Sequence, residues 1–181
     1  MHSNKGRVRI IGGEHRGRRI AVADRPGLRP TPDRVRETLF NWLGQRLDGL
    51  ACLDLFAGSG VLGFEAASRG ARRVVMVEND RIAFESLRAA KALLETAAIE
   101  IVFEDAMKYL ARDGERFDVV FLDPPFRQNA LAAVLAQLPA RLAEGGRVYV
   151  EAPGPFEPPS PWRELKRSRA GQVSYQLLEK P

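Results

Sequence analysis

The sequence predicts an α/β fold built on a doubly wound, mostly parallel seven-stranded sheet that ends in an antiparallel hairpin. Strand-like and helix-like segments alternate along most of the 181 residues, as they do in right-handed βαβ units. Several of the strand-like segments are continuous apolar runs, which are typical of parallel strands covered on both faces. The last two strand-like segments flank Ala170-Gly171, and this spacing predicts the closing hairpin.

The chain begins with a second, smaller hairpin. Strand-like residues 7–11 and 19–23 flank a glycine-rich turn at 12–17, which is the pattern of a β-hairpin. We therefore expect two parts, a basic N-terminal β-hairpin arm over 1–30 and a main domain over 31–181.

A stiff linker with three prolines leads from this hairpin to the first helix. The helix is expected over 33–43, and Thr31 or Asp33 can cap its N-terminus.

The main domain then alternates between strands and helices. Its strands are expected over 51–56, 74–78, 99–103, 117–122, 147–151, 162–169 and 172–179. Its helices are expected between them, over about 61–69, 81–97, 105–112 and 128–143.

Composition narrows the possible functions. The single cysteine, Cys52, excludes an internal disulfide framework and indicates a reducing compartment. It lies in an expected core strand, where a thiol packs as a small apolar group. Two histidines and one cysteine cannot build a thiolate or histidine zinc site, and we expect no metal. No apolar run reaches the roughly 20 residues of a membrane span, and the first residues lack the apolar core of a secretory signal. We expect a cytoplasmic protein that does not contact a membrane.

Positive charge is concentrated at the amino end. Residues 1–36 contain ten Lys and Arg against three Asp and Glu, which gives +7 in a chain whose net charge is +5. Nine of the ten are Arg, which suits bidentate contacts to phosphate. A basic arm can also serve solubility alone, but the pattern favours a nucleic-acid partner. The expected contacts are Arg7, Arg9, Arg16, Arg18, Arg19, Arg29, Arg34 and Arg36.

A glycine-rich turn follows the first core strand. Residues 58–63 read G-S-G-V-L-G, a turn whose free amides at a helix N-terminus favour a nucleotide-like cofactor. Glu78 ends the next strand, where its carboxylate can accept both ribose hydroxyls. This pattern alone fits a dinucleotide equally well. Asp54, inside the first strand, favours a methionine moiety, because a carboxylate suits an ammonium group and repels a pyrophosphate.

Asp123-Pro124-Pro125-Phe126 follows another apolar strand. Asp123 can accept a hydrogen from an exocyclic amine of a base, with the carbonyl of Pro124 as a second acceptor. The prolines stiffen the loop, and Phe126 offers a face for an extruded base. An ordinary strand-ending turn also explains Asp-Pro alone. Together with the glycine turn, the four residues predict a catalytic motif for methyl transfer to an exocyclic nitrogen.

With these motifs, the whole chain resembles the RsmD family, bacterial methyltransferases that modify a guanine N2 in small-subunit ribosomal RNA. The most specific match is residues 28–43, L-R-P-T-P-D-R-V-R-E-T-L-F-N-W-L. The other matches are residues 9–13, 53–60, 123–126 and 170–173. The proline-rich tract over 153–161 departs from the family pattern.

The resemblance implies a Rossmann-like, class I S-adenosylmethionine-dependent methyltransferase. It implies a cytoplasmic enzyme that methylates N2 of guanine 966 in 16S rRNA, within the small ribosomal subunit or its assembly intermediate. We expect a monomer, because nothing in the sequence demands a partner chain. Asp105 would accept from the adenine amino group of the cofactor, or cap the following helix. The cofactor-binding residues would be Asp54, Phe56, Gly58, Gly60, Glu78, Asn79, Asp105 and Ala106.

Three alternatives stay open. A DNA adenine or cytosine amino-methyltransferase uses the same motifs, although 181 residues leave little room for a base-reading domain. A non-catalytic RNA-binding assembly factor would keep the arm, but Asp123 and the glycine turn are intact. An NAD-dependent oxidoreductase is disfavoured by Asp54.

Overall fold

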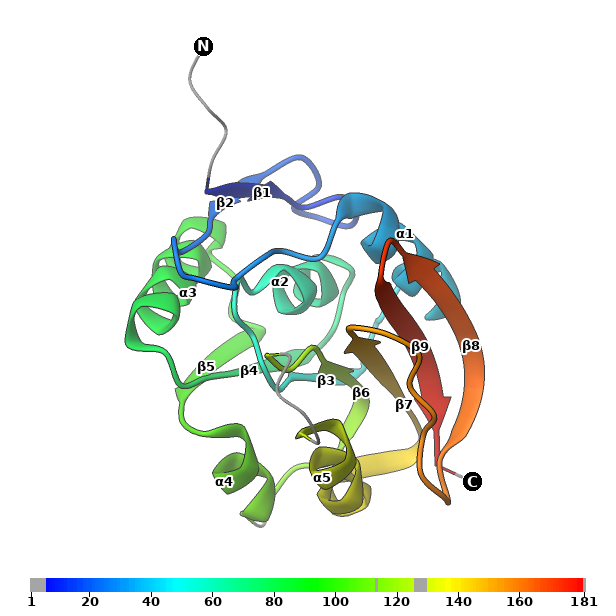
Figure 1. The fold of residues 1–181 in the computed structure, drawn as a ribbon. Helices are drawn as coiled ribbons and strands as arrows, with labels where there is room; N and C mark the ends of the chain where they lie inside the picture. The colour runs from blue at the N-terminus through cyan, green and yellow to red at the C-terminus, as the bar shows by residue number, and fades with distance from the viewer. Residues whose placement is uncertain (1–5, 113, 126–129, 181) are drawn as a thin grey trace.

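Residues 6–112, 114–125 and 130–180 are described by a computed structural model (Figure 1). In chain order the elements are β1 (Arg7–Arg9), β2 (Arg19–Ala21), α1 (Asp33–Trp42), β3 (Ala51–Asp54), α2 (Val61–Ser68), β4 (Arg73–Glu78), α3 (Arg81–Leu94), β5 (Ile99–Phe103), α4 (Ala106–Ala111), β6 (Phe117–Leu122), α5 (Ala130–Gln137), the 3₁₀ helix η1 (Leu138–Arg141), β7 (Leu142–Ala152), β8 (Arg163–Ala170) and β9 (Val173–Glu179).

The main sheet has seven strands in the order β5-β4-β3-β6-β7-β9-β8, and β1 pairs with β2 in a separate sheet. The five strands from β5 to β7 run parallel, and β9 is antiparallel to both of its neighbours. This topology confirms the predicted α/β class and the C-terminal hairpin.

Different elements cover the two faces of the sheet (Figure 1). The face that carries Cys52 packs against the hairpin, α1, α2 and α3, and the face that carries Leu53 packs against α4 and α5. Alternate residues of one strand thus serve both cores, which explains the continuous apolar runs. Burial raises the pKa of the Cys52 thiol to about 12, so this side chain packs as an apolar group.

The helix expected over 128–143 is shorter in the structure, and residues 128 and 129 lie outside the described part. An α-helix, α5, is followed by η1, and β7 begins at Leu142 instead of 147. Pro139 at the start of η1 has no amide hydrogen to continue the α-helical ladder.

Two other helix ends differ from the expectation. The helix expected over 81–97 is α3, which ends before Glu95 because that residue adopts a left-handed conformation with φ 52°. The predicted cap of α1 is wrong, since Pro32 precedes the helix without a side-chain cap. The hydroxyl of Thr31 instead donates to Glu151 at 2.9 Å.

The proline-rich tract over 153–161 contains no helix or strand. Trp162 directly after it is buried, and its indole nitrogen donates to the carbonyl of Leu135 at 3.1 Å. This contact fixes the end of the tract on α5.

The N-terminal hairpin packs on the main domain, above α2 and α3 (Figure 1). Ile10 and Ile20 are fully buried in the same core as α1 and α2. Both strands are shorter than expected. Beyond the end of β1, the amides of Ile11 and Gly12 donate to Glu65, at 3.1 and 2.7 Å, instead of to a facing strand. The hairpin and the main domain share one hydrophobic core. The expected boundary between an arm over 1–30 and a domain over 31–181 stays a prediction that concerns their separate functions.

A buried ion cluster centred on Glu65 joins the hairpin, α1 and α2. Arg36 donates to Glu65 at 3.0 Å and to the carbonyl of Arg9 at 2.9 Å, and Arg69 donates to the other Glu65 oxygen at 3.0 Å. Arg36 also pairs with Asp33. The expectation that Arg36 contacts nucleic acid is corrected, because its side chain is fully buried and does not reach the surface.

We predict that Glu65→Ala lowers the free energy of unfolding by about 3–5 kcal/mol, since the change leaves buried guanidinium groups without their partner. Urea denaturation measures the loss. Glu85→Ala is the matched control, because Glu85 pairs with Arg81 and Arg88 on an exposed helix face, where ion pairs contribute little. Equal losses in both variants would contradict a central role for the Glu65 cluster.

Candidate active site

A cavity of about 1110 Å³ lies at the carboxyl edge of the parallel strands. Residues at or directly after the carboxyl ends of β3, β4, β5, β6 and β7 line it, together with residues 25–32 of the linker before α1. The predicted residues that the structure brings together here are Asp54, Phe56, Gly58, Glu78, Asn79, Asp105, Ala106, Asp123, Pro124 and Pro125. Phe126, the fourth residue of the predicted catalytic motif, lies outside the described residues.

The two predicted glycines have different roles. Gly60, with φ 78°, precedes α2 on the core side and does not line the cavity, and a Cβ there would come within 2.4–2.8 Å of core side chains. Gly58, with φ 53°, lines the cavity, and a Cβ there would lie 2.8 Å from Leu28 of the linker. Glycine thus lets this turn approach the Leu28 side chain of the linker closely.

Glu78 and Asp105 are two of the carboxylates that line the part of the cavity next to β4 and β5. Glu78 accepts hydrogen bonds from three backbone amides at 2.7–2.8 Å, one of them from Gly58. Asp105 caps α4, and its Oδ1 accepts from two amides of the first turn at 3.0 and 3.1 Å. The cap uses one oxygen of Asp105, so the predicted contact to a ligand remains compatible with it.

Asp54 lies at the base of the cavity and is 2% exposed. Its Oδ2 accepts from the amide of Gly63 at 3.1 Å. Burial raises the pKa of Asp54 to about 7; the hydrogen bond from Gly63 opposes this rise, and the charges of Glu78 and Glu151 add to it. A cationic group in the cavity would favour the ionised carboxylate.

Sequence reasoning missed a second carboxylate beside Asp123. Leu122 of β6 is paired with Val150 of the parallel strand β7. The next residues, Asp123 and Glu151, therefore lie next to each other. Glu151 accepts from the hydroxyls of Tyr149 at 2.8 Å and Thr31 at 2.9 Å. Burial raises the pKa of both carboxyls, and the charges of Glu151 and Asp54 raise that of Asp123 further. The sequence held a signal for this pair. Phe121 and Tyr149 are paired on adjacent strands, and a carboxylate follows two residues after each of them.

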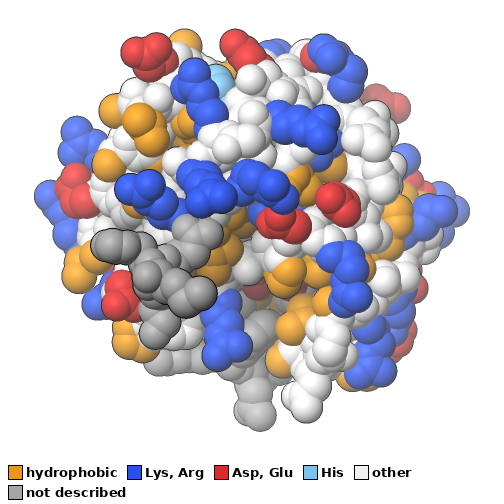
Figure 2. Space-filling model, turned by 90° about the horizontal axis from the view of Figure 1, so that it is seen from above, with side chains coloured by type: hydrophobic (Ala, Val, Ile, Leu, Met, Phe, Trp, Pro, Cys, Tyr) orange, Lys and Arg blue, Asp and Glu red, His pale blue; other side chains and the backbone are white. Residues whose placement is uncertain are grey.

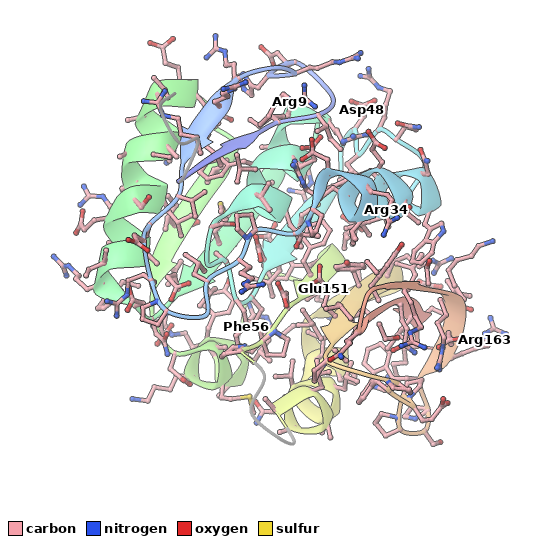
Figure 3. The ribbon with its side chains drawn as sticks, turned by 45° about the horizontal axis from the view of Figure 1, so that its top comes forward. Arg9, Arg34, Asp48, Phe56, Glu151 and Arg163 are labelled. Carbon is pink, nitrogen blue, oxygen red and sulfur yellow. The ribbon has the colours of Figure 1, made fainter. Side chains whose placement is uncertain are left out.

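The linker is fixed at both ends of the cavity. Arg25 donates to Asp80 at the start of α3, at 2.6 and 3.1 Å, and Thr31 donates to Glu151 at the end of β7. Figure 3 shows Phe56 and Glu151 in the middle of the molecule, next to the segment that leads into α1. The segment expected only to connect two elements is therefore a wall of the site.

The face above the hairpin and α1 is rich in basic side chains, and a row of Lys and Arg crosses it in Figure 2. Arg9 pairs with Asp33 at 3.2 Å, and both side chains are about half exposed. Arg29 belongs to both regions, because it is exposed and also lines the cavity. The predicted nucleic-acid contacts that are exposed are Arg7, Arg9, Arg16, Arg18, Arg19, Arg29 and Arg34.

Within the described ranges, no three His, Cys, Asp or Glu side chains are placed to hold a metal ion. No helix in the described part of the chain is long and apolar enough to cross a membrane.

Comparisons with known proteins give consistent matches. The family model described as conserved hypothetical protein 95 matches residues 8–179. The chain is 44% identical to ribosomal RNA small subunit methyltransferase D of Escherichia coli K12, covering 99% of this chain and 93% of that protein. It is 41% identical to the protein of the same name from Haemophilus influenzae, with 97% and 95% covered.

Solved structures also match over nearly the whole chain. A putative methyltransferase from Escherichia coli superposes with a TM-score of 0.88 at 43% identity, covering 97% of this chain and 98% of that chain. A putative methylase from Haemophilus influenzae superposes with a TM-score of 0.83 at 38% identity, covering 97% and 99%.

We predict that Asp54→Asn stabilises the ligand-free protein at pH 8 and not at pH 4. An unfolded Asp ionises near pH 3.9, whereas folded Asp54 holds its proton up to about pH 7. The stability present below pH 4 is therefore lost as the pH rises through 7, by at most about 4 kcal/mol. The Asn variant avoids this loss. Urea denaturation of both proteins across this pH range checks it, and a stability difference independent of pH would contradict it.

Proposed function

The chain belongs to the RsmD family, whose model is described as conserved hypothetical protein 95, and on this premise we propose that it methylates the N2 amino group of guanine 966 in 16S rRNA. Its fold is that of a class I methyltransferase, and its cofactor is S-adenosylmethionine. The observation that carries the proposal is one cavity that holds Asp54 of the glycine-turn strand and Asp123 of the Asp-Pro-Pro loop.

The residues of the cavity fit this cofactor. When bound, S-adenosylmethionine supplies a methyl group on a positively charged sulfur. The buried carboxylate of Asp54, held near other negative charges, suits the ammonium group of the methionine moiety. Gly58 lines the cavity without a side chain, and Glu78 is fixed where it can accept from ribose hydroxyls. Phe56, Asn79, Asp105 and Ala106 line the remaining cofactor part of the cavity.

The Asp-Pro-Pro loop holds the base. An exocyclic amine is a poor nucleophile because its lone pair is delocalised into the ring. By accepting one amine hydrogen, Asp123 favours a pyramidal nitrogen and directs its lone pair away from the ring plane. The carbonyl of Pro124 is the second acceptor, and Pro125 keeps the loop stiff. The stacking of the base on Phe126 stays a prediction.

The basic face next to the cavity binds RNA phosphates in this proposal. Seven of the predicted arginines are exposed, and one of them, Arg29, also lines the cavity. Relatives named ribosomal RNA small subunit methyltransferase D support the small ribosomal subunit, or its assembly intermediate, as the substrate. The proposed enzyme acts as a monomer in the cytoplasm.

A methylation assay tests the proposed reaction. Small subunits from a strain that lacks this protein are incubated with the purified chain and S-adenosylmethionine that carries a tritiated methyl group. Nuclease mapping is expected to find the label in N2-methylguanosine at one position of 16S rRNA. Label on an adenine, in DNA or in protein would each overturn the proposal.

We predict that Asp123→Ala lowers methyl transfer by about 2–4 kcal/mol of barrier, because one well-placed acceptor at the reacting amine is lost. Cofactor affinity should stay within a few-fold of the parent, since Asp123 contacts the base. Single-turnover assays and calorimetry with the cofactor measure the two quantities. Activity above about a tenth of the parent would mean that the amine is held by other groups.

Glu78→Ala provides the contrast to this variant. Its loss should weaken cofactor binding and change the rate at saturating cofactor much less. Identical kinetic changes in both variants would contradict the separate roles.

We predict that Arg16→Gln combined with Arg34→Gln weakens binding to small subunits and flattens its salt dependence. Each lost phosphate contact should reduce the slope of log affinity against log salt by roughly 0.7–0.9. The matched control is Arg163→Gln with Lys166→Gln, which removes the same charge from β8. Equal slopes for the two double variants would argue against the basic face.

A further inference from the structure

Asp123 and Glu151 form a pair of carboxyl groups. The proposed methyl transfer gives a role to Asp123 and none to Glu151. Asp123 directly follows β6, and Glu151 lies near the end of the adjacent parallel strand β7. Both side chains line the same cavity. Adjacent strands lie about 4.8 Å apart, so one planar edge of a base can reach both groups. In the described part of the chain, neither carboxylate forms an ion pair. The cavity thus presents two neighbouring hydrogen-bond acceptors.

Glu151 is held in a fixed orientation. The hydroxyls of Tyr149 and Thr31 both donate to its Oε1, at 2.8 and 2.9 Å. Tyr149 is fully buried and Glu151 is 7% exposed, so the surrounding core fixes the carboxyl plane. These two bonds leave Oε2 unused. Burial raises the pKa of Asp123 and of Glu151, and hydrogen-bond donors from a ligand would offset the cost of their charges.

The bases that carry an exocyclic amine differ at the neighbouring ring nitrogen. In guanine, the N1–H donor lies directly beside the N2 amine, so these two neighbouring groups are both donors, and the O6 acceptor lies on the far side of N1. In adenine and cytosine, the ring nitrogen beside the amine is an acceptor without hydrogen. A second carboxylate next to Asp123 therefore attracts the guanine edge and repels the other two, because a buried acceptor facing an acceptor is left unpaired.

We propose that Glu151 is a specificity-determining residue that accepts the N1–H of guanine while Asp123 accepts a hydrogen of the N2 amine. This inference rests on the proposed function and assigns the selection of the base to a residue outside the Asp-Pro-Pro loop. Thr31 and Tyr149 act as positioning residues, since they touch Glu151 and hold its carboxyl group.

A base analogue tests the inference. 2-Aminopurine carries the same amine at C2 as guanine, but its N1 is an acceptor without hydrogen. Small subunits are reconstituted with guanine or with 2-aminopurine at the mapped nucleotide, and kcat/KM is measured for both. The parent enzyme should prefer guanine by at least about 100-fold, because sites built for a donor reject analogues that lack it.

Glu151→Gln should reduce this preference by at least about tenfold. The glutamine amide can accept from N1–H of guanine or donate to N1 of 2-aminopurine, so the repulsion is removed. Glu78→Gln is the control, because a change on the cofactor side alters the rates with both bases and leaves their ratio unchanged. Thermal unfolding and cofactor binding of each variant show that the site is intact.

The outcomes separate the two proposals. A parent enzyme that methylates guanine N2 and 2-aminopurine equally well overturns the role of Glu151 and leaves the proposed function standing. A ratio that Glu151→Gln does not change overturns it as well. A parent enzyme that labels no guanine N2 overturns the proposed function itself. The parent ratio needs no variant, so the inference is tested even where Glu151→Gln fails to fold.

Discussion

The buried carboxylate of Glu65 is the interaction on which the arrangement of this protein depends. It accepts from two arginines and two backbone amides, which come from α1, α2 and the hairpin. A buried charge that loses one such partner is strongly destabilised, so these elements hold each other in place as a unit. The cluster thereby sets the position of α1, and with it the linker that forms one wall of the cavity.

The buried carboxyl groups of the cavity lower the stability of the folded protein. Asp54, Asp123 and Glu151 lie at the ends of three strands on one face of the sheet, and burial raises the pKa of each. A core selected for packing alone would place apolar groups there, since buried carboxyls without cations are costly. Such clusters are expected where a ligand supplies the missing donors. An ammonium group suits Asp54, and the donor edge of a base suits the other two. Because β3, β6 and β7 are neighbours in the sheet, the two ligands would lie side by side, as methyl transfer requires.

The sequence predicted what local patterns determine. Apolar runs and the glycine turn were sufficient for the parallel sheet, and the resemblance to the RsmD family is confirmed, as is the cofactor. Charge counting failed for Arg36, because its partner Glu65 lies 29 residues away and no local pattern distinguishes a buried arginine from an exposed one. The bond between Thr31 and Glu151 spans 120 residues and was missed for the same reason. Long-range polar pairs decide such details, and they depend on the complete fold.

These long-range bonds also connect the basic face to the cavity. The linker is tied to α3 through Arg25 and Asp80 and to β7 through Thr31 and Glu151. Arg29 lies between these two anchors and is exposed. A phosphate bound at Arg29 would therefore constrain the same segment in which Thr31, two residues later, orients Glu151 through a hydrogen bond. Because Gly58 lies close to Leu28 of the same linker, the wall proposed to meet the RNA also borders the glycine turn proposed to bind the cofactor. The linker is thus a segment through which the proposed RNA contact, base selection and cofactor binding can depend on each other.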